Sequence, residues 1–92
     1  MIRSIRHRGL KRLYEQGDRR GIGANMCRRV ERILFVLDQA ETLDEINMPG
    51  YRLHALTGKR KGYWSIRVTG NWRITFVFDN GEVYDVNLED YH

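Results

Sequence analysis

The 92-residue sequence contains a single cysteine, a single proline and no long hydrophobic run. A chain with one cysteine cannot form an intrachain disulfide, and this cysteine usage gives no indication of an oxidising compartment. The longest apolar run covers only residues 33–37, which is far too short for a membrane span or a signal peptide. We therefore expect a single cytoplasmic domain over residues 1–92, with a modest core and no membrane association.

The sequence also lacks the usual signatures of metal sites and of nucleophilic catalysis. Its three histidines, His7, His54 and His92, have no helical i, i+4 spacing, and only one cysteine could join them. Its two serines, Ser4 and Ser65, lie in no nucleophile motif. The sequence therefore predicts no metal site and no cofactor.

Charges of opposite sign are separated along the chain. Lys and Arg number ten against three acidic residues in 1–32, and none against four in 33–50. They number six against none in 51–73, and none against five in 74–92, for a net charge of +4. Two basic blocks of this kind could fold into one positive face, which is typical of proteins that bind nucleic acid. A solvated surface of mixed charge explains the pattern equally well.

Residues 62–78 alternate apolar and polar side chains on both sides of Gly70 and Asn71, which predicts a β-hairpin. The predicted core face consists of Trp64, Ile66, Val68, Trp72, Ile74, Phe76 and Phe78. The opposite face would carry Tyr63, Ser65, Arg67, Arg73 and Thr75. A turn at residues 69–71 would place Arg67 opposite Arg73. Because like charges opposed across a strand pair are destabilising, this pair indicates an anionic partner.

Two helices are predicted before the hairpin. Leu10, Leu13 and Tyr14 have helical spacing, which predicts a helix over residues 8–16 that Gly17 ends. A second helix is expected to begin after Asn25, a favourable N-cap residue. Its apolar face would contain Met26, Val30, Ile33, Leu34 and Leu37. We expect this face to pack on the apolar face of the hairpin.

The remaining segments predict short elements. Thr42 and Glu45 have the spacing of a capping box, and Pro49 would end the short helical turn that they begin. Residues 1–5 and 51–56 could form strands, and a three-residue turn at 79–81 would bring Tyr84, Val86 and Leu88 into the core. The predicted fold class is therefore α+β, with two N-terminal helices packed on a small, mostly antiparallel β-sheet.

The polar residues that remain suit phosphodiester chemistry. Cleavage of RNA by its own 2′-hydroxyl needs a base, an acid and cations that stabilise the charge on phosphorus, and it needs no metal. Proton transfer could use His54, Asp90 and His92, and phosphates could be bound by Lys59, Arg60, Lys61, Arg67 and Arg73. Tyr63 or Tyr91 could stack on a base.

Each of these residues also has a purely structural interpretation. His54 could be an ordinary strand histidine, and Arg73 could pair with Asp85 across the second hairpin. The cationic loop at residues 58–62 could be a solvated turn. Terminal residues such as Tyr91 and His92 are often frayed, and they can take part in chemistry only if the last strand holds them.

Several motifs together resemble the HigB branch of the RelE/ParE toxin superfamily. They are Gly62-Tyr63-Trp64-Ser65-Ile66, Asn71-Trp72-Arg73-Ile74-Thr75-Phe76, the upstream Tyr51-x-Leu53-His54-x-Leu56-x-Gly58 and the final Glu89-Asp90-Tyr91-His92. The opening, with Gly9-Leu10-Lys11, fits as well, so that the resemblance covers nearly the whole chain.

The resemblance implies a RelE-like fold and the toxin of a type II toxin–antitoxin system, an endoribonuclease that cuts mRNA in the decoding site of the 70S ribosome. It implies proton-transfer or orienting roles for His54, Asp90 and His92, a contact of Arg73 with the scissile phosphate, and a role for Tyr91 in positioning the message. It also implies a HigA-like antitoxin with a helix-turn-helix. The toxin would be bound to operator DNA only through this antitoxin.

One position departs from the family pattern. Thr57 is uncharged where members of the family carry a lysine, so that phosphate stabilisation could fall to Lys59 or Arg60. Two other functions remain open from the sequence. They are a non-catalytic inhibitor that binds RNA or the ribosome through the same cationic face, and an inhibitor of DNA gyrase, as in the ParE relatives.

Overall fold

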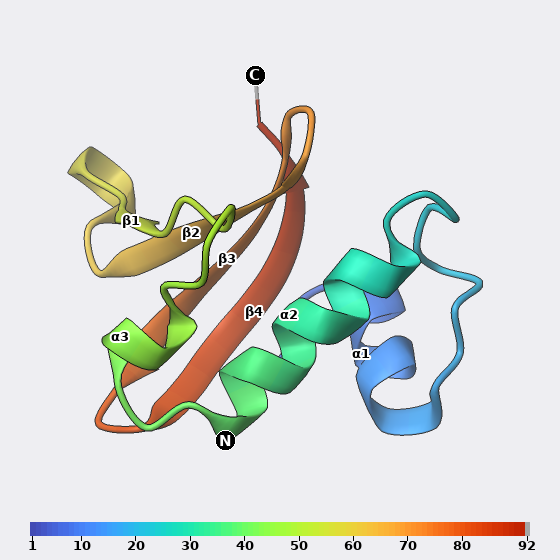
Figure 1. Cartoon of the computed structure of the whole chain (residues 1–92), viewed down its shortest axis with the longest axis horizontal. Coiled ribbons are helices and arrows are strands. Elements are labelled where there is room, and N and C mark those ends of the chain that lie inside the picture. Colours follow the sequence, from blue (N-terminus) through green and yellow to red (C-terminus); the bar gives the residue numbers. More distant parts are fainter. Residues whose placement is uncertain (92) are drawn as a thin grey trace.

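The computed structural model describes residues 1–91, in which three helices pack on a four-stranded antiparallel sheet (Figure 1). The helices are α1 (Arg8–Gln16), α2 (Cys27–Gln39) and α3 (Leu43–Ile46), and a 3-10 turn covers Gly58–Arg60. The strands are β1 (His54–Ala55), β2 (Tyr63–Thr69), β3 (Trp72–Asp79) and β4 (Glu82–Asp90), in the sheet order β1-β2-β3-β4. The predicted α+β class and the two N-terminal helices are confirmed.

The helix boundaries follow the local sequence, with one difference. α1 has the predicted bounds, and Gly17 ends it in the left-handed conformation, with φ of 70° and its amide donating to the carbonyls of Arg12 and Leu13. The prediction that Asn25 caps α2 was wrong. The chain is still turning at that point, because the amide of Met26 donates to the carbonyl of Gly23 at 2.8 Å. Met26 therefore takes the N-cap position, without a side-chain cap.

The core lies between the helices and one face of the sheet. Side chains of α1 and α2, among them Leu10, Val30 and Ile33, belong to the same buried cluster as Ile74 and Phe76 of β3. The predicted hairpin of β2 and β3 is confirmed, with Ile66 opposite Ile74 and Arg67 opposite Arg73. Trp64, Trp72 and Phe78 are only partly buried at the border of this core.

The turn between β3 and β4 differs from the prediction. Asp79 pairs directly with Glu82, so that only Asn80 and Gly81 form the turn, both with positive φ, of 53° and 88°. Two positive φ values are the requirement of a type I′ turn, which matches the twist of a hairpin. The shorter turn exposes Tyr84 and buries Val83 instead.

A β-bulge then restores the predicted face in the second half of β4. Val77 pairs with Tyr84 and Thr75 with Asn87, so that β4 contains one extra residue near Asp85, whose φ is 59°. Beyond this bulge Val86 and Leu88 are buried, as predicted.

The shorter predicted elements are confirmed in part. The capping box at Thr42 and Glu45 begins α3. The strand expected at residues 51–56 is reduced to His54 and Ala55. Residues 1–5 form no full strand, but Ile2 and Ile5 make parallel bridges to β4. No helix in residues 1–91 has the length and apolar character needed to cross a membrane.

Candidate active site

The open face of the sheet carries a pocket, opposite the face that the helices cover. Across the strands, His54 pairs with Ser65 and Ser65 with Thr75, and in the next row Arg67 pairs with Arg73 and Arg73 with Glu89. Side chains from both rows line the pocket, which has a volume of about 370 Å³. The lining consists of His54, Leu56, Thr57, Arg60, Ser65, Arg73, Thr75, Glu89 and Tyr91.

His54 lies in β1 at the edge of the sheet, with its ring exposed. Its Nδ1 is 3.0 Å from the carbonyl oxygen of Arg52. A carbonyl oxygen only accepts, so Nδ1 carries the proton and donates it to this contact. In the neutral ring, the lone pair is then on Nε2, which makes Nε2 the atom that can take up a proton.

Arg73 supplies the positive charge of the pocket. Its Nη1 donates to the carbonyls of Gly70 and Trp72 at 3.1 and 3.2 Å, and the guanidinium forms no ion pair with residues 1–91. The alternative that Arg73 pairs with Asp85 was wrong. Asp85 lies at the bulge, where it pairs with Arg6 at 3.3 Å. Within residues 1–91, Arg73 therefore lies between its like-charged neighbour Arg67 on β2 and Glu89 on β4 and forms no ion pair with either strand. This leaves its guanidinium available to an anion, as the anion-binding hypothesis requires.

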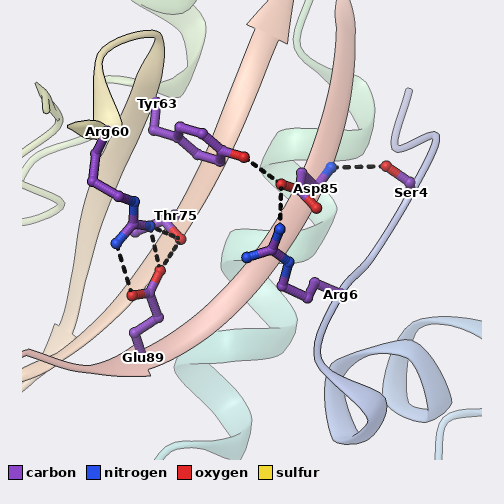
Figure 2. Close-up of polar contacts among 7 residues, drawn as sticks. All are labelled: Ser4, Arg6, Arg60, Tyr63, Thr75, Asp85 and Glu89. Atoms are coloured by element: carbon purple, nitrogen blue, oxygen red, sulfur yellow. Dashed lines mark hydrogen bonds and ion pairs between the residues drawn. The ribbon is translucent and has the colours of Figure 1, made fainter.

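Arg60, the second cation of the pocket, is bound by Glu89. Nη1 and Nη2 of Arg60 donate to the two carboxylate oxygens of Glu89 at 3.1 and 2.7 Å, and the Thr75 hydroxyl donates to the same carboxylate (Figure 2). The hydrogen bond from Arg60 lowers the pKa of Glu89, although burial opposes it, and the bond from Thr75 adds to the lowering. Glu89 therefore stays ionised near neutral pH.

Tyr63 connects this pair to the N-terminal segment. The Arg60 guanidinium lies over the Tyr63 ring, 5.2 Å from its centroid, and the Tyr63 hydroxyl donates to Asp85 (Figure 2). This hydrogen bond raises the pKa of Tyr63. The Asp85 carboxylate in turn pairs with Arg6, and the backbone amide of Asp85 donates to the hydroxyl of Ser4. Tyr63, predicted to stack on RNA, is therefore engaged within the protein.

The C-terminal residues are placed unequally. Tyr91 lines the pocket and is 59% exposed, and its amide donates to the carbonyl of Asn71 at 2.8 Å, which holds the chain to the β2–β3 turn. Asp90 does not line the pocket. It pairs with Trp72 in register, on the side of the strand opposite Glu89. His92 lies outside the described residues, so that its predicted role stays a prediction.

The other predicted RNA-binding residues surround the pocket without lining it. Lys59 and Lys61 are exposed on the 3-10 turn and its end, and they form no ion pair with residues 1–91. Arg67 is half-buried beside Arg73. These three cations could meet the backbone of a nucleic acid that enters the pocket.

Sequence reasoning missed part of the pocket. Ser65 and Thr75 were placed on the correct face, but nothing indicated that they would be buried there, to 2% and 4% exposure. Glu89 was noted only as part of a terminal motif. Its alternation with Asp90 was the available signal, since the register that turns Leu88 inward must turn Glu89 toward the open face.

The pocket can bind an anion and transfer a proton. Arg73 offers a guanidinium that forms no ion pair within residues 1–91, His54 offers a ring nitrogen with a lone pair, and the exposed Tyr91 ring offers a surface for stacking. In residues 1–91, no group of three His, Cys, Asp or Glu side chains is placed to hold a metal ion.

Comparison with known proteins identifies the family of the chain. Residues 3–92 match the model of the HigB-like toxin family, described as RelE-like toxins of the type II toxin–antitoxin system HigB. Over 92 residues, and the full length of both chains, the sequence is 49% identical to a protein of Proteus vulgaris named Endoribonuclease HigB. The chain therefore belongs to the HigB-like family of type II toxin–antitoxin toxins.

Proposed function

We propose that this toxin is an endoribonuclease that cuts mRNA in the decoding site of the 70S ribosome, without a metal ion, and so inhibits translation. The observation that carries this proposal is the meeting of His54, Arg73 and Tyr91 in one pocket on the open face of the sheet. The name of the 49% identical relative, an endoribonuclease, supports the same activity.

In this mechanism His54 is the general base. Its Nδ1 is held by the Arg52 carbonyl, which leaves Nε2 to take the proton of the 2′-hydroxyl as that oxygen attacks phosphorus. Arg73 binds the scissile phosphate and stabilises the charge that develops on it in the transition state. The leaving 5′-oxygen needs a proton donor, a role that we assign to His92, because Asp90 does not line the pocket.

The message is held by groups around the pocket. Tyr91 stacks on a base next to the scissile bond, and Lys59, Lys61 and Arg67 contact the neighbouring phosphates. Every group in this scheme is a side chain of the toxin, so that we expect cleavage to continue when divalent cations are chelated from the toxin's site.

The test is cleavage of mRNA on purified ribosomes by the wild type and by His54→Ala, Arg73→Ala and His92→Ala. Loss of an electrostatic or proton-transfer group typically slows catalysis by about 10²- to 10³-fold, and we expect losses of that order. Because ribosomes need Mg²⁺, this assay keeps Mg²⁺ present, and EDTA treatment of the toxin beforehand tests only for a tightly bound metal ion such as Zn²⁺. Undiminished cleavage in all three variants would defeat the assignment.

Two other outcomes identify the alternative functions. Arrest of translation with intact message would indicate a non-catalytic inhibitor that binds RNA or the ribosome. Loss of DNA supercoiling with normal translation would indicate a gyrase inhibitor.

As a type II toxin, the protein has an antitoxin partner. We propose that this partner is a HigA-like protein with a helix-turn-helix, that operator DNA is bound only through it, and that both proteins act in the cytoplasm, where the ribosomes are. Co-purification with the product of the adjacent gene tests the partner. A gel-shift assay with toxin alone, antitoxin alone and both together tests the assignment of DNA binding.

A further inference from the structure

The sequence assigns Arg60 to RNA binding with its neighbours Lys59 and Lys61, but the three side chains differ in the structure. Lys59 and Lys61 are exposed, whereas Arg60 is bound through both of its Nη atoms to the carboxylate of Glu89. The hydroxyl of Thr75, a residue that is only 4% exposed, donates to the same carboxylate. Arg60 is thus part of a half-buried polar cluster.

This cluster changes what Arg60 can do for RNA. A bidentate contact between a guanidinium and a carboxylate is among the stronger pairings in proteins, and a phosphate would have to displace it. The positive charge of Arg60 is also largely compensated by Glu89, whereas Arg73 has no acidic partner in residues 1–91. Arg60 is therefore poorly suited to be a phosphate ligand in the pocket.

The same contacts hold the 3-10 turn against the sheet. The turn begins at Gly58 and Gly62 follows it, both with positive φ, of 64° and 100°, and the backbone hydrogen bonds of the turn are local. Arg60 extends from it across β2 and β3 to reach Glu89 on β4 (Figure 2). Because Leu56 and Thr57 beside the turn line the pocket, the position of this wall depends on that contact.

We propose that Glu89 is a positioning residue. By binding Arg60, it fixes the pocket wall at residues 56–60 relative to His54 and Arg73, and the contacts of this loop with RNA phosphates fall to Lys59 and Lys61. The kinetic part of this inference rests on the proposed endoribonuclease activity, and the structural part does not.

The kinetic test uses Glu89→Gln, Arg60→Gln and the double variant in cleavage of ribosome-bound mRNA. A displaced wall disturbs the alignment of the reacting groups, so that we expect each single variant to lower kcat by about 10-fold or more with less than about a twofold change in KM. Because the two residues act as one unit, the double variant should be no slower than the single variants.

A matched control exists on the same strand. Glu82 forms an equivalent bidentate pair with Arg3, with both contacts at 2.9 Å, and neither residue lines the pocket. Glu82→Gln should therefore leave kcat and KM at the wild-type values. A loss of kcat as large as that of Glu89→Gln would assign the effect to general destabilisation and overturn the proposal.

If Arg60 instead contacts the message directly, the two single variants should change KM in opposite directions. Arg60→Gln would then raise KM, while Glu89→Gln would lower it by releasing the guanidinium for phosphate. This result would overturn the positioning role and restore Arg60 as an RNA ligand.

Hydrogen exchange of the isolated toxin tests the structural part without RNA. We expect the amides of residues 56–62 to exchange faster in Glu89→Gln and Arg60→Gln, and by a smaller factor in Thr75→Val, which removes only one donor. If neither Glu89→Gln nor Arg60→Gln folds, the exchange of these amides is measured in Thr75→Val only. Unchanged exchange would overturn the proposal even in a toxin that cleaves RNA, whereas faster exchange in a toxin without cleavage would refute the proposed function only.

Discussion

On one face of the four-stranded sheet, Ile66, Ile74 and Phe76 are fully buried against the helices. On the other face, the same strands carry Arg67 and Arg73 directly opposite each other, above a pocket that is open to solvent. The first face is held by apolar packing, which depends little on pH or salt. The second is held by hydrogen bonds and ion pairs, and it retains one repulsive contact between like charges.

This difference shows where the protein gives up stability for function. An apolar face needs only that its residues exclude water, and most of the free energy of folding comes from such burial. The open face would be more stable if one of its opposed arginines were neutral. Its charges are instead arranged so that, within residues 1–91, Arg60 forms an ion pair with Glu89 and Arg73 forms none. Arg73, which has no ion pair in that part of the chain, is the arginine that the proposed mechanism uses.

The largest effect is expected from a cavity in the apolar face. Phe76 is 0% exposed, and replacing it with Ala should lower the free energy of unfolding by about 3–5 kcal/mol. Urea denaturation followed by circular dichroism measures this loss. The cleavage rate of the fraction that remains folded should change far less than that of Arg73→Ala. A cost below about 1 kcal/mol would mean that this face contributes less to stability than its burial indicates.

The two faces also differ in how far the sequence predicts them. Alternation with period two assigned Ile66, Ile74 and Phe76 to the core, and helical spacing gave α1 its bounds, because burial acts on every residue of the pattern. The turn at Asn80 and Gly81 was predicted one residue too long. The pattern cannot distinguish a longer turn from a short turn followed by a bulge, since both return Val86 and Leu88 to the same face.

The pocket was predicted in its components but not in its connections. Family motifs and charge selected His54, Arg73 and Tyr91, which the structure brings together. The contact between Arg60 and Glu89 joins residues 29 positions apart, one in the 3-10 turn before β2 and the other on β4. No local pattern encodes a contact between segments so far apart, so Arg60 was predicted to be equivalent to Lys59.

A smaller effect on stability, confined to the open face, is expected when the pH is lowered. The hydrogen bond from Arg60 lowers the pKa of Glu89 below its usual value of 4.5, so that the folded state binds this proton less readily than the unfolded state. The pair therefore stabilises the protein above about pH 4.5, and this stabilisation is lost as the pH falls through the folded pKa. For a pair that is partly exposed, the contribution is expected to be below about 1 kcal/mol.

Thermal unfolding from pH 6 to pH 3.5 measures this contribution. The difference in Tm between the wild type and Glu89→Gln should shrink as the pH falls, because the wild type loses the pair while the variant never has it. Phe76→Ala serves as the control, since the cost of an apolar cavity should be nearly the same at both ends of this range. A constant difference for Glu89→Gln would show that the carboxylate contributes through packing rather than through its charge.

The smallest effect on stability is expected from a change at Arg67, and it is a gain in stability rather than a loss. Replacing it with Gln removes the like charge opposite Arg73 and should raise the free energy of unfolding by a few tenths of a kcal/mol, about the size of an unfavourable cross-strand pair. The same change should raise KM for ribosome-bound mRNA and weaken the dependence of KM on salt, because one phosphate contact is lost. Arg8→Gln is the control, since α1 lies on the opposite side of the molecule from β1 (Figure 1). If Arg67→Gln lowered stability and left KM unchanged, the opposed arginines would be a structural feature of the hairpin. Arg73 alone would then remain as the residue of this face at which stability is given up for RNA binding.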